Sequence, residues 1–260
     1  MVLLHFGDVE PKVVALQMLL NSNLLREELL EVDGIFGRQT LQSVLDFQKQ
    51  ACLKQDGVVG PHTWEALVRN RPFSVIDAVD VTDPGYFNDT IPYLRRAGGD
   101  PVVVGCLCNG IQEALRQILA KVSAAGSIVA LRFHGHGNTA IQSVSDGIPA
   151  PVRSRSSLSR NTVAAMQGSL GVLQFYFASF GSVEMHGCNV GYGPEGRAFL
   201  ALLANLWGVP VSAGVGFQRE GGWRTFRLEG PVQTAFPRGA TLKTWAEGQP
   251  EPVRMSAARA

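Results

Sequence analysis

The stretch "IVALRFHGHGN" at residues 128–138 decides the fold of the larger part of this chain. Its apolar, β-branched and aromatic residues predict a buried strand, which ends abruptly in two histidines separated and followed by glycine. A second stretch, "SVEMHGCNVG" at residues 182–191, has the same construction, with a cysteine in the last polar place. We therefore expect two buried strands whose polar ends lie near each other.

Strands and helices alternate on both sides of these two stretches. Nearly continuous apolar strands that alternate with amphipathic helices are typical of a mostly parallel sheet with both faces covered. In such sheets ligands bind beyond the carboxyl ends of the strands, where both polar stretches lie. The other expected elements are the strands "FSVIDAV" (73–79), "DPVVVGCL" (100–107) and "VPVSAG" (209–214) and the helices "NGIQEALRQILAKV" (109–122) and "GPEGRAFLALLANLW" (193–207).

A repeat marks the N-terminal part of the chain. "VDGIFGRQT" at residues 32–40 and "QDGVVGPHT" at residues 55–63 share the pattern Asp-Gly-x-x-Gly-x-x-Thr. Each copy precedes apolar residues at helical spacing, and an earlier stripe of the same kind begins at Val13. This pattern predicts a small three-helix bundle over residues 1–70, followed by an α/β domain over residues 74–250.

Several motifs of this bundle resemble one known family. In order along the chain they are "VVALQMLL", "VDGIFGRQT", "SVLDFQ" and "QDGVVGPHTWEAL". Together they resemble the peptidoglycan-binding domain of cell-wall hydrolases along nearly its whole length, from residue 7 to 68. The resemblance implies peptidoglycan as a partner. The same helical bundle is reused in proteins that bind other things, so a docking module with another partner is the alternative.

A thiol and an imidazole at neighbouring strand ends can form a nucleophile and its general base. Cysteine suits this task because its ordinary pKa is near the working pH and an adjacent histidine lowers it further. Cys188 is the candidate nucleophile. Glycines at 137 and 187 leave room for a substrate carbonyl, and the backbone N–H groups beside Gly137 and Cys188 are the candidate donors to a developing oxyanion.

These residues carry a second resemblance. "FHGHGN", "MHGCNVG", "GRAFLALLANLWG" and "GGWRTFRLEG" together resemble the bacterial branch of the caspase-like cysteine peptidases. The resemblance implies a caspase-like sheet domain, with Cys188 as nucleophile and His136, in the small-His-Gly position, as base. It also implies a protein or peptide substrate. The chain lacks the Gln-Ala-Cys-Arg-Gly signature of caspases, so their preference for cutting after aspartate is not carried over.

Other functions remain open at this point. His134, His136, His186 and Cys188 could converge on a zinc ion if alternate strand residues face the same side. No acidic partner is adjacent to them in the sequence and only one thiolate is available, so we expect no metal and no other cofactor. The alternatives to a protein-cutting enzyme are a peptidoglycan amidase or endopeptidase, and a non-enzymatic adaptor with a degenerate site.

Substrate preference is the least clearly indicated property. Carboxylates near the catalytic strand ends would favour cleavage after arginine or lysine, and we lean slightly to that preference. Turn residues that face water are an equally good interpretation of the same aspartates. The candidate substrate-binding residues are Asp77, Asp80, Asp83 and Asp146.

Composition limits the classes of partner. A net charge of +1 on 260 residues gives no field that would attract nucleic acid, and no apolar run approaches the length of a membrane span. Four scattered cysteines do not form a disulfide scaffold. The N-terminus lacks the features of a signal peptide. We therefore expect synthesis in the cytoplasm, with delivery of the protein as an effector or toxin by a secretion or injection apparatus, or release upon lysis.

Overall fold

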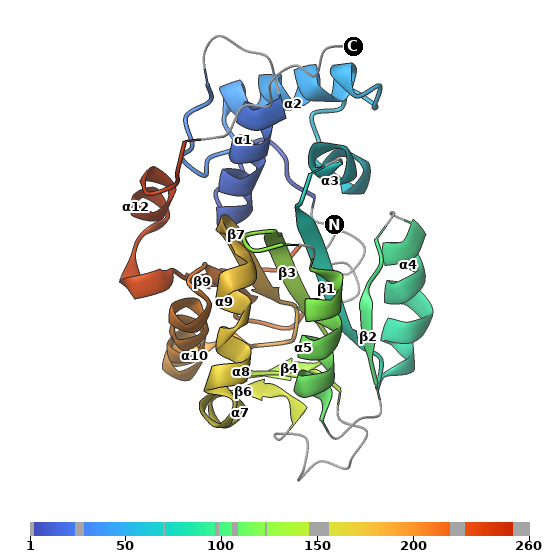
Figure 1. Cartoon of the computed structure of the whole chain (residues 1–260), viewed down its shortest axis with the longest axis vertical. Coiled ribbons are helices and arrows are strands. Elements are labelled where there is room, and N and C mark those ends of the chain that lie inside the picture. The colour runs from blue at the N-terminus through green and yellow to red at the C-terminus, as the bar shows by residue number, and fades with distance from the viewer. Residues whose placement is uncertain are drawn as a thin grey trace.

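The structure is a computed structural model of the chain. Figure 1 shows the N-terminal helices, drawn in blue to teal, at one end of the molecule, and the sheet with most of the other helices at the other end. The residues that the structure describes are 3–23, 29–69, 71–96, 99–105, 109–122, 124–145, 156–218 and 227–251.

A six-stranded sheet forms the centre of the molecule. Its strand order is β2-β1-β3-β7-β8-β9, and all neighbouring pairs are parallel except β8 with β9. This arrangement confirms the predicted α/β class with a mostly parallel sheet, and the two decisive stretches form the adjacent strands β3 and β7. The strands are β1 (Ser74–Asp80), β2 (Val102–Val104), β3 (Ile128–His134), β7 (Phe177–Met185), β8 (Val211–Gly214) and β9 (Val232–Ala235).

Helices and a small second sheet surround this centre. The N-terminal helices are α1 (Pro11–Asn23), α2 (Arg38–Gln50) and α3 (Pro61–Val68), as the repeat predicts. A three-stranded sheet consists of β4 (Gly137–Asn138), β5 (Ile141–Gln142) and β6 (Leu158–Ser159). The remaining helices are the π-helix η1 (Tyr86–Thr90), α4 (Ile91–Arg96), α5 (Gly110–Lys121), α7 (Arg160–Ala165), α8 (Gln167–Gly171), α9 (Leu173–Tyr176), α10 (Gly193–Trp207), the 3-10 helix η3 (Pro237–Gly239) and α12 (Leu242–Glu247).

The two Asp-Gly turns of the N-terminal bundle are held in the same way. Gly34 and Gly57 have the positive φ angles of 76° and 68° that favour glycine. A buried glutamine of the preceding helix accepts the glycine N–H in each case, Gln17 at 2.9 Å from Gly34 and Gln48 at 3.0 Å from Gly57. The repeat in the sequence therefore corresponds to a repeated turn, fixed from inside by an amide.

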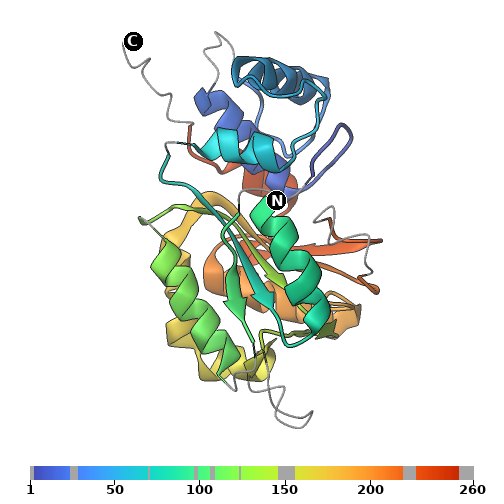
Figure 2. The same cartoon turned by 90° about the vertical axis from the view of Figure 1, so that its right-hand side faces the viewer.

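The two faces of the sheet are covered by different parts of the chain. Leu131, Phe133 and Val183 pack with α5 and α10 in one core. On the other side, Val129 and Phe180 pack with α4 and the N-terminal bundle in a second core. Val129 reaches this side because the strand register shifts between Ile128 and Ala130. Figure 2 shows α5 and α4, drawn in green and teal, on opposite sides of the sheet. The N-terminal bundle thus supplies a large part of the cover for one sheet face.

Charged residues also lie on the face that the bundle covers. Asp77, Arg132 and Glu184 are paired across β1, β3 and β7, and all three side chains are buried. Lys12 at the start of α1 reaches this row, with Nζ 2.5 Å from Glu184 Oε1 and 3.2 Å from Glu10 Oε2. Burial raises the pKa of the Glu184 carboxyl, but Lys12 and His186 together outweigh it and hold that pKa below its ordinary value. The ion pair therefore neutralises a charge that the sheet could not otherwise bury.

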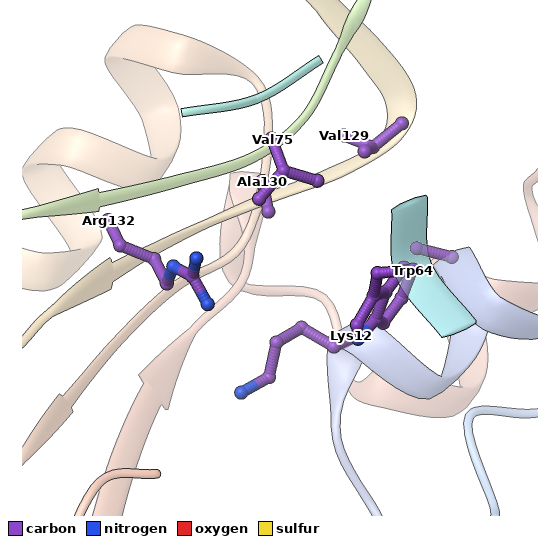
Figure 3. Close-up of a pocket in the computed structure, with 7 residues that line it drawn as sticks. Lys12, Trp64, Val75, Val129, Ala130 and Arg132 are labelled. Atoms are coloured by element: carbon purple, nitrogen blue, oxygen red, sulfur yellow. The ribbon is translucent and has the colours of Figure 1, made fainter. Parts of the chain in front are cut away.

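The space between Lys12 and the sheet is nearly filled. A cavity of about 10 Å³, room for roughly one water molecule, lies between α1, α3 and the strands β1 and β3. Figure 3 shows Lys12 and Arg132 extending toward this space, with Trp64 on the helical side. The bundle and the sheet are therefore packed closely where the buried charges lie.

Two further contacts join the bundle to the last part of the chain. The α12 residue Leu242 packs against Gly34, so that a Cβ added there would lie 2.9 Å from Leu242 Cδ1. Arg227 Nη2 donates to Asp8 Oδ1 at 2.8 Å, and a cavity of about 240 Å³ lies between this ion pair and the Lys12–Glu184 pair. The sequence predicts a boundary between two domains at residues 70–74. In the structure, residues from both sides of this boundary share one apolar core.

We predict that Lys12→Met strongly destabilises the protein, because it leaves Glu184 buried without its cation. Removing one partner of a buried pair destabilises by about 3–5 kcal/mol, which urea unfolding at pH 7 will measure. Lys54→Met is the matched control, since Lys54 is 87% exposed in its contact with Asp56 and should change stability by less than about 1 kcal/mol. Equal effects of the two substitutions would contradict this role of Lys12. The double substitution Lys12→Met with Glu184→Gln should recover part of the loss.

Candidate functional site

The polar ends of β3 and β7 meet at one edge of the sheet. The parallel register pairs Phe133 with Met185, so the two chains leave the sheet side by side. A Cβ added to Gly137 would lie 2.7 Å from the Gly187 Cα, closer than real Cβ atoms approach. Glycine is needed at these positions for close backbone contact. Gly137, one candidate oxyanion donor, forms this contact, and Cys188, the other, directly follows Gly187. The role of both donors stays a prediction.

His136 lies on the exposed side of the site. Its side chain is 62% exposed, and its Nε2 is 2.9 Å from Asp83 Oδ2. The Gly85 N–H and then His136 lower the pKa of the Asp83 carboxyl, which therefore stays charged beside the imidazole. If the neutral ring donates through Nε2, its Nδ1 is left as a proton acceptor. The Tyr86 ring contacts His136 edge-on, with centroids 5.7 Å apart.

Cys188 is a free, partly buried cysteine on the turn after β7. The Gln218 N–H donates to Cys188 Sγ at 3.3 Å, which fixes the sulfur against the loop that follows β8. Burial first, and then the charges of Cys188, Asp83 and Asp80, raise the pKa of Tyr86 to about 12. Tyr86 thus contacts the His136 ring and interacts electrostatically with Cys188. It is one of the site residues, with Gln218, that sequence patterns alone do not reveal.

Two further histidines, His134 and His186, lie beneath the site. The rings of His134 and His186 are buried and stacked, with centroids 4.7 Å apart. His134 Nε2 is 2.8 Å from Asp77 Oδ1, and His186 Nε2 is 3.3 Å from Glu184 Oε2. Each ring thus contacts a carboxylate of the buried charge row. His134 lies two residues before His136, and His186 lies two residues before Cys188.

The residues of the metal-site alternative lie in different surroundings. β3 ends at His134, so strand alternation does not continue to His136: the side chain of His134 is 2% exposed and that of His136 62%. All three histidines have carboxylate partners, which come from other strands or loops or from the position two residues earlier. Within the part of the chain that the structure describes, no three His, Cys, Asp or Glu side chains are grouped to hold a metal ion.

The predicted substrate contacts of Asp77 and Asp80 are wrong. Asp77 is 5% exposed, and both its oxygens accept hydrogen bonds from Arg132 at 2.7 Å. Burial raises the pKa of Asp77, but Arg132 and His134 outweigh it and keep that pKa well below its ordinary value. Asp80 is also 5% exposed and accepts from the backbone N–H of Thr82. Strand residues at these positions face covered parts of the sheet and not an open cleft.

The other two predicted substrate-binding residues are Asp83 and Asp146. Asp83 is engaged with His136, as described above. Asp146 lies outside the residues that the structure describes. The slight preference for arginine or lysine therefore loses the carboxylates on which it depended.

We predict that protonation of His134 destabilises the fold below neutral pH. Burial, partly opposed by the Asp77 hydrogen bond, lowers the pKa of His134 to about 4, against an ordinary value of 6.5. Because the folded pKa is the lower one, the contribution is complete above pH 6.5 and is lost as the pH falls toward 4. The free energy of unfolding should decrease by at most about 3 kcal/mol from this group over that window.

Urea unfolding of the parent and of His134→Gln, between pH 4 and 7, isolates this effect. Asp77, Arg132 and His186 surround the ring in both proteins, so the difference between the two curves reports on His134. His62→Gln, at an exposed position, should leave the parent slope intact. Parallel curves for the parent and His134→Gln would show that the ring is not held neutral by the fold.

The models of two families match parts of this chain. Residues 9–67 match the model of a family described as a putative peptidoglycan binding domain, as the motifs of the bundle predict. Residues 100–245, more than half of the chain, match the model of a family described as a domain of unknown function (DUF4347). No helix in the described ranges is long and apolar enough to cross a membrane.

One curated protein resembles a short part of the chain. It is an uncharacterized protein in the bpoA1 3' region of Kitasatospora aureofaciens, 54% identical over 37 residues. The match covers 14% of this chain and 31% of that protein, so the chain spans about a third of the relative's length.

Proposed function

The chain belongs to the family described as a domain of unknown function (DUF4347), and from this premise we propose that its sheet domain is a cysteine peptidase of the caspase-like type. Cys188 is the nucleophile and His136 the general base. The observation that supports the proposal best is the contact of the β3 and β7 ends, which brings the turns bearing these two residues together. The binding of Cys188 Sγ by Gln218 and the pairing of His136 with Asp83 add to it.

The reaction would proceed by acyl transfer. Asp83 holds His136 through Nε2, so that Nδ1 takes the thiol proton as the Cys188 sulfur attacks the peptide carbonyl. The C–N bond then breaks, and the departing amine takes the proton from His136. Water, deprotonated by the same ring, hydrolyses the thioester and releases the thiol and a carboxylic acid. The backbone N–H groups of Gly137 and Cys188 are the proposed donors to the oxyanion.

A peptidoglycan amidase or endopeptidase is the second candidate. The match of residues 9–67 to a putative peptidoglycan binding domain favours it, because a wall-binding module would hold the enzyme beside wall peptides. In either case we propose peptidoglycan as the partner of the bundle and delivery of the protein as an effector or toxin. Digestion of denatured casein supports the first candidate, and release of peptides from purified sacculi supports the second.

We predict that Cys188→Ala and His136→Ala each lower kcat by about 10³-fold or more, while the unfolding midpoint changes little. The two groups act as a unit, so the double substitution should be no worse than either single one. Cys52→Ser is the matched control, because Cys52 is a free and exposed cysteine far along the chain from the site. Both substrates should be tested. Full activity of Cys188→Ala on both would exclude this nucleophile, and no activity of the parent on either would favour the adaptor.

We further predict that Asp83→Asn lowers kcat by about 10- to 100-fold, since an amide holds the imidazole less firmly in the required orientation. His136 is largely exposed and Asp83 is partly exposed, so stability should change by less than about 1 kcal/mol. Asp89→Asn, an exposed position on the adjacent π-helix, serves as the control. A kcat for Asp83→Asn equal to that of Asp89→Asn would exclude an orienting role.

A further inference from the structure

We infer that Gln142 is a positioning residue that holds the turns of Cys188 and His136 in a fixed relation. The inference rests on the proposed function for its kinetic consequences. Its geometric basis is a single buried amide that contacts both turns.

Gln142 reaches this position because the chain folds back directly after His136. β4 and β5 form a short antiparallel pair in which Gly137 lies opposite Gln142. The Ser143 N–H donates to the His136 carbonyl at 2.9 Å, so the returning strand is fixed beside the histidine. The side chain of Gln142 points inward, and the residue is fully buried.

The amide of Gln142 then joins the two turns. Its Oε1 accepts the Gly187 N–H at 2.8 Å, one residue before Cys188. Its Nε2 donates to the Ser143 carbonyl at 3.1 Å and to the His136 carbonyl at 3.4 Å. One planar group thus connects the backbone of the proposed base with the backbone beside the proposed nucleophile.

Little free space surrounds this amide. A Cβ added to Gly187 would lie 2.9 Å from Gln142 Oε1, 2.9 Å from the His136 oxygen and 2.7 Å from the Gly137 Cα. The separation of the two turns is therefore set by atoms in contact. A shift of about 1 Å in reacting groups can lower a rate by about 100-fold, so a change in this amide should reach the chemistry.

Both the oxygen and the nitrogen of the Gln142 amide form hydrogen bonds. Other residues of similar length cannot form both. Methionine would supply neither the acceptor for Gly187 nor the donor for His136. An ionised glutamate would keep the acceptor but direct a carboxylate at two carbonyl oxygens. A protonated glutamate can donate again, so a carboxyl at this position should act well only when it is neutral.

The test compares Gln142→Met and Gln142→Glu with Gln48→Met in the full chain. Gln48 is the matched control because it is also a buried glutamine that accepts a glycine N–H, but in the N-terminal bundle. The first readout is kcat and KM for a casein-derived peptide. We expect Gln142→Met to lower kcat by about 10- to 100-fold with KM within about threefold, and Gln48→Met to leave kcat unchanged. Gln142→Glu should recover activity as the pH falls.

The second readout does not require catalysis. Iodoacetamide alkylation of Cys188, followed by mass spectrometry of the cysteine-containing peptide across pH 5–9, reports on the surroundings of the thiol. Gln142→Met should shift this profile and Gln48→Met should not. If the parent cleaves no substrate, the proposed peptidase function fails, and the alkylation profiles still decide the role of Gln142.

Two results would overturn the inference. One is a loss of kcat in Gln142→Met no larger than in Gln48→Met, with identical alkylation profiles. The other is a pH–rate profile of Gln142→Glu that coincides with that of the parent. If Gln142→Met does not fold, the pH dependence of Gln142→Glu, in both rate and alkylation, decides the question.

Discussion

A carboxylate inside a parallel sheet has to be neutralised by another part of the chain, and much of this structure depends on how Glu184 meets that requirement. Lys12 supplies the cation from the first helix, which places the N-terminal bundle over the sheet face. The second oxygen of Glu184 contacts His186, directly before the turn that carries Cys188. The same charge therefore joins the packing of the bundle to the support of the candidate site.

The sequence contained enough to predict the strand ends and their neighbourhood. Apolar runs that stop at His-Gly are strand ends in a parallel sheet, and the Asp-Gly repeat was sufficient for the bundle. The partners of His134 and His136 were not predictable, because Asp77 and Asp83 lie 57 and 53 residues away from the rings they contact. Only the register of β1 against β3 brings them together. Cys188 lies on the predicted turn, whereas its contact with Gln218 depends on the path of a loop.

His134 and His136 show why periodicity failed at this point. Alternation predicts that both face the same side, but it holds only while the strand continues. β3 ends at His134, and Gly135 packs so tightly on Asp80 that a Cβ there would lie 2.9 Å from the Asp80 Cβ. The chain therefore turns, which leaves one imidazole buried and the other exposed. The pattern of residue types predicts the end of the strand but not the direction of the side chains beyond it, since the neighbouring segments determine that direction.

The contact between Lys12 and Glu184 joins residues 172 positions apart. During synthesis α1 leaves the ribosome long before β7, the strand that it will cover, so until then Lys12 lacks its partner Glu184 and the bundle has an open apolar face. Contacts between residues so distant in the chain form late and make folding slow. The turn that bears Cys188, the proposed nucleophile, directly follows β7, the strand that completes this contact. A nascent chain that has not yet reached β7 therefore lacks both the carboxylate that pairs with Lys12 and the turn that bears Cys188, so the packing of the bundle and the candidate site form at the same stage.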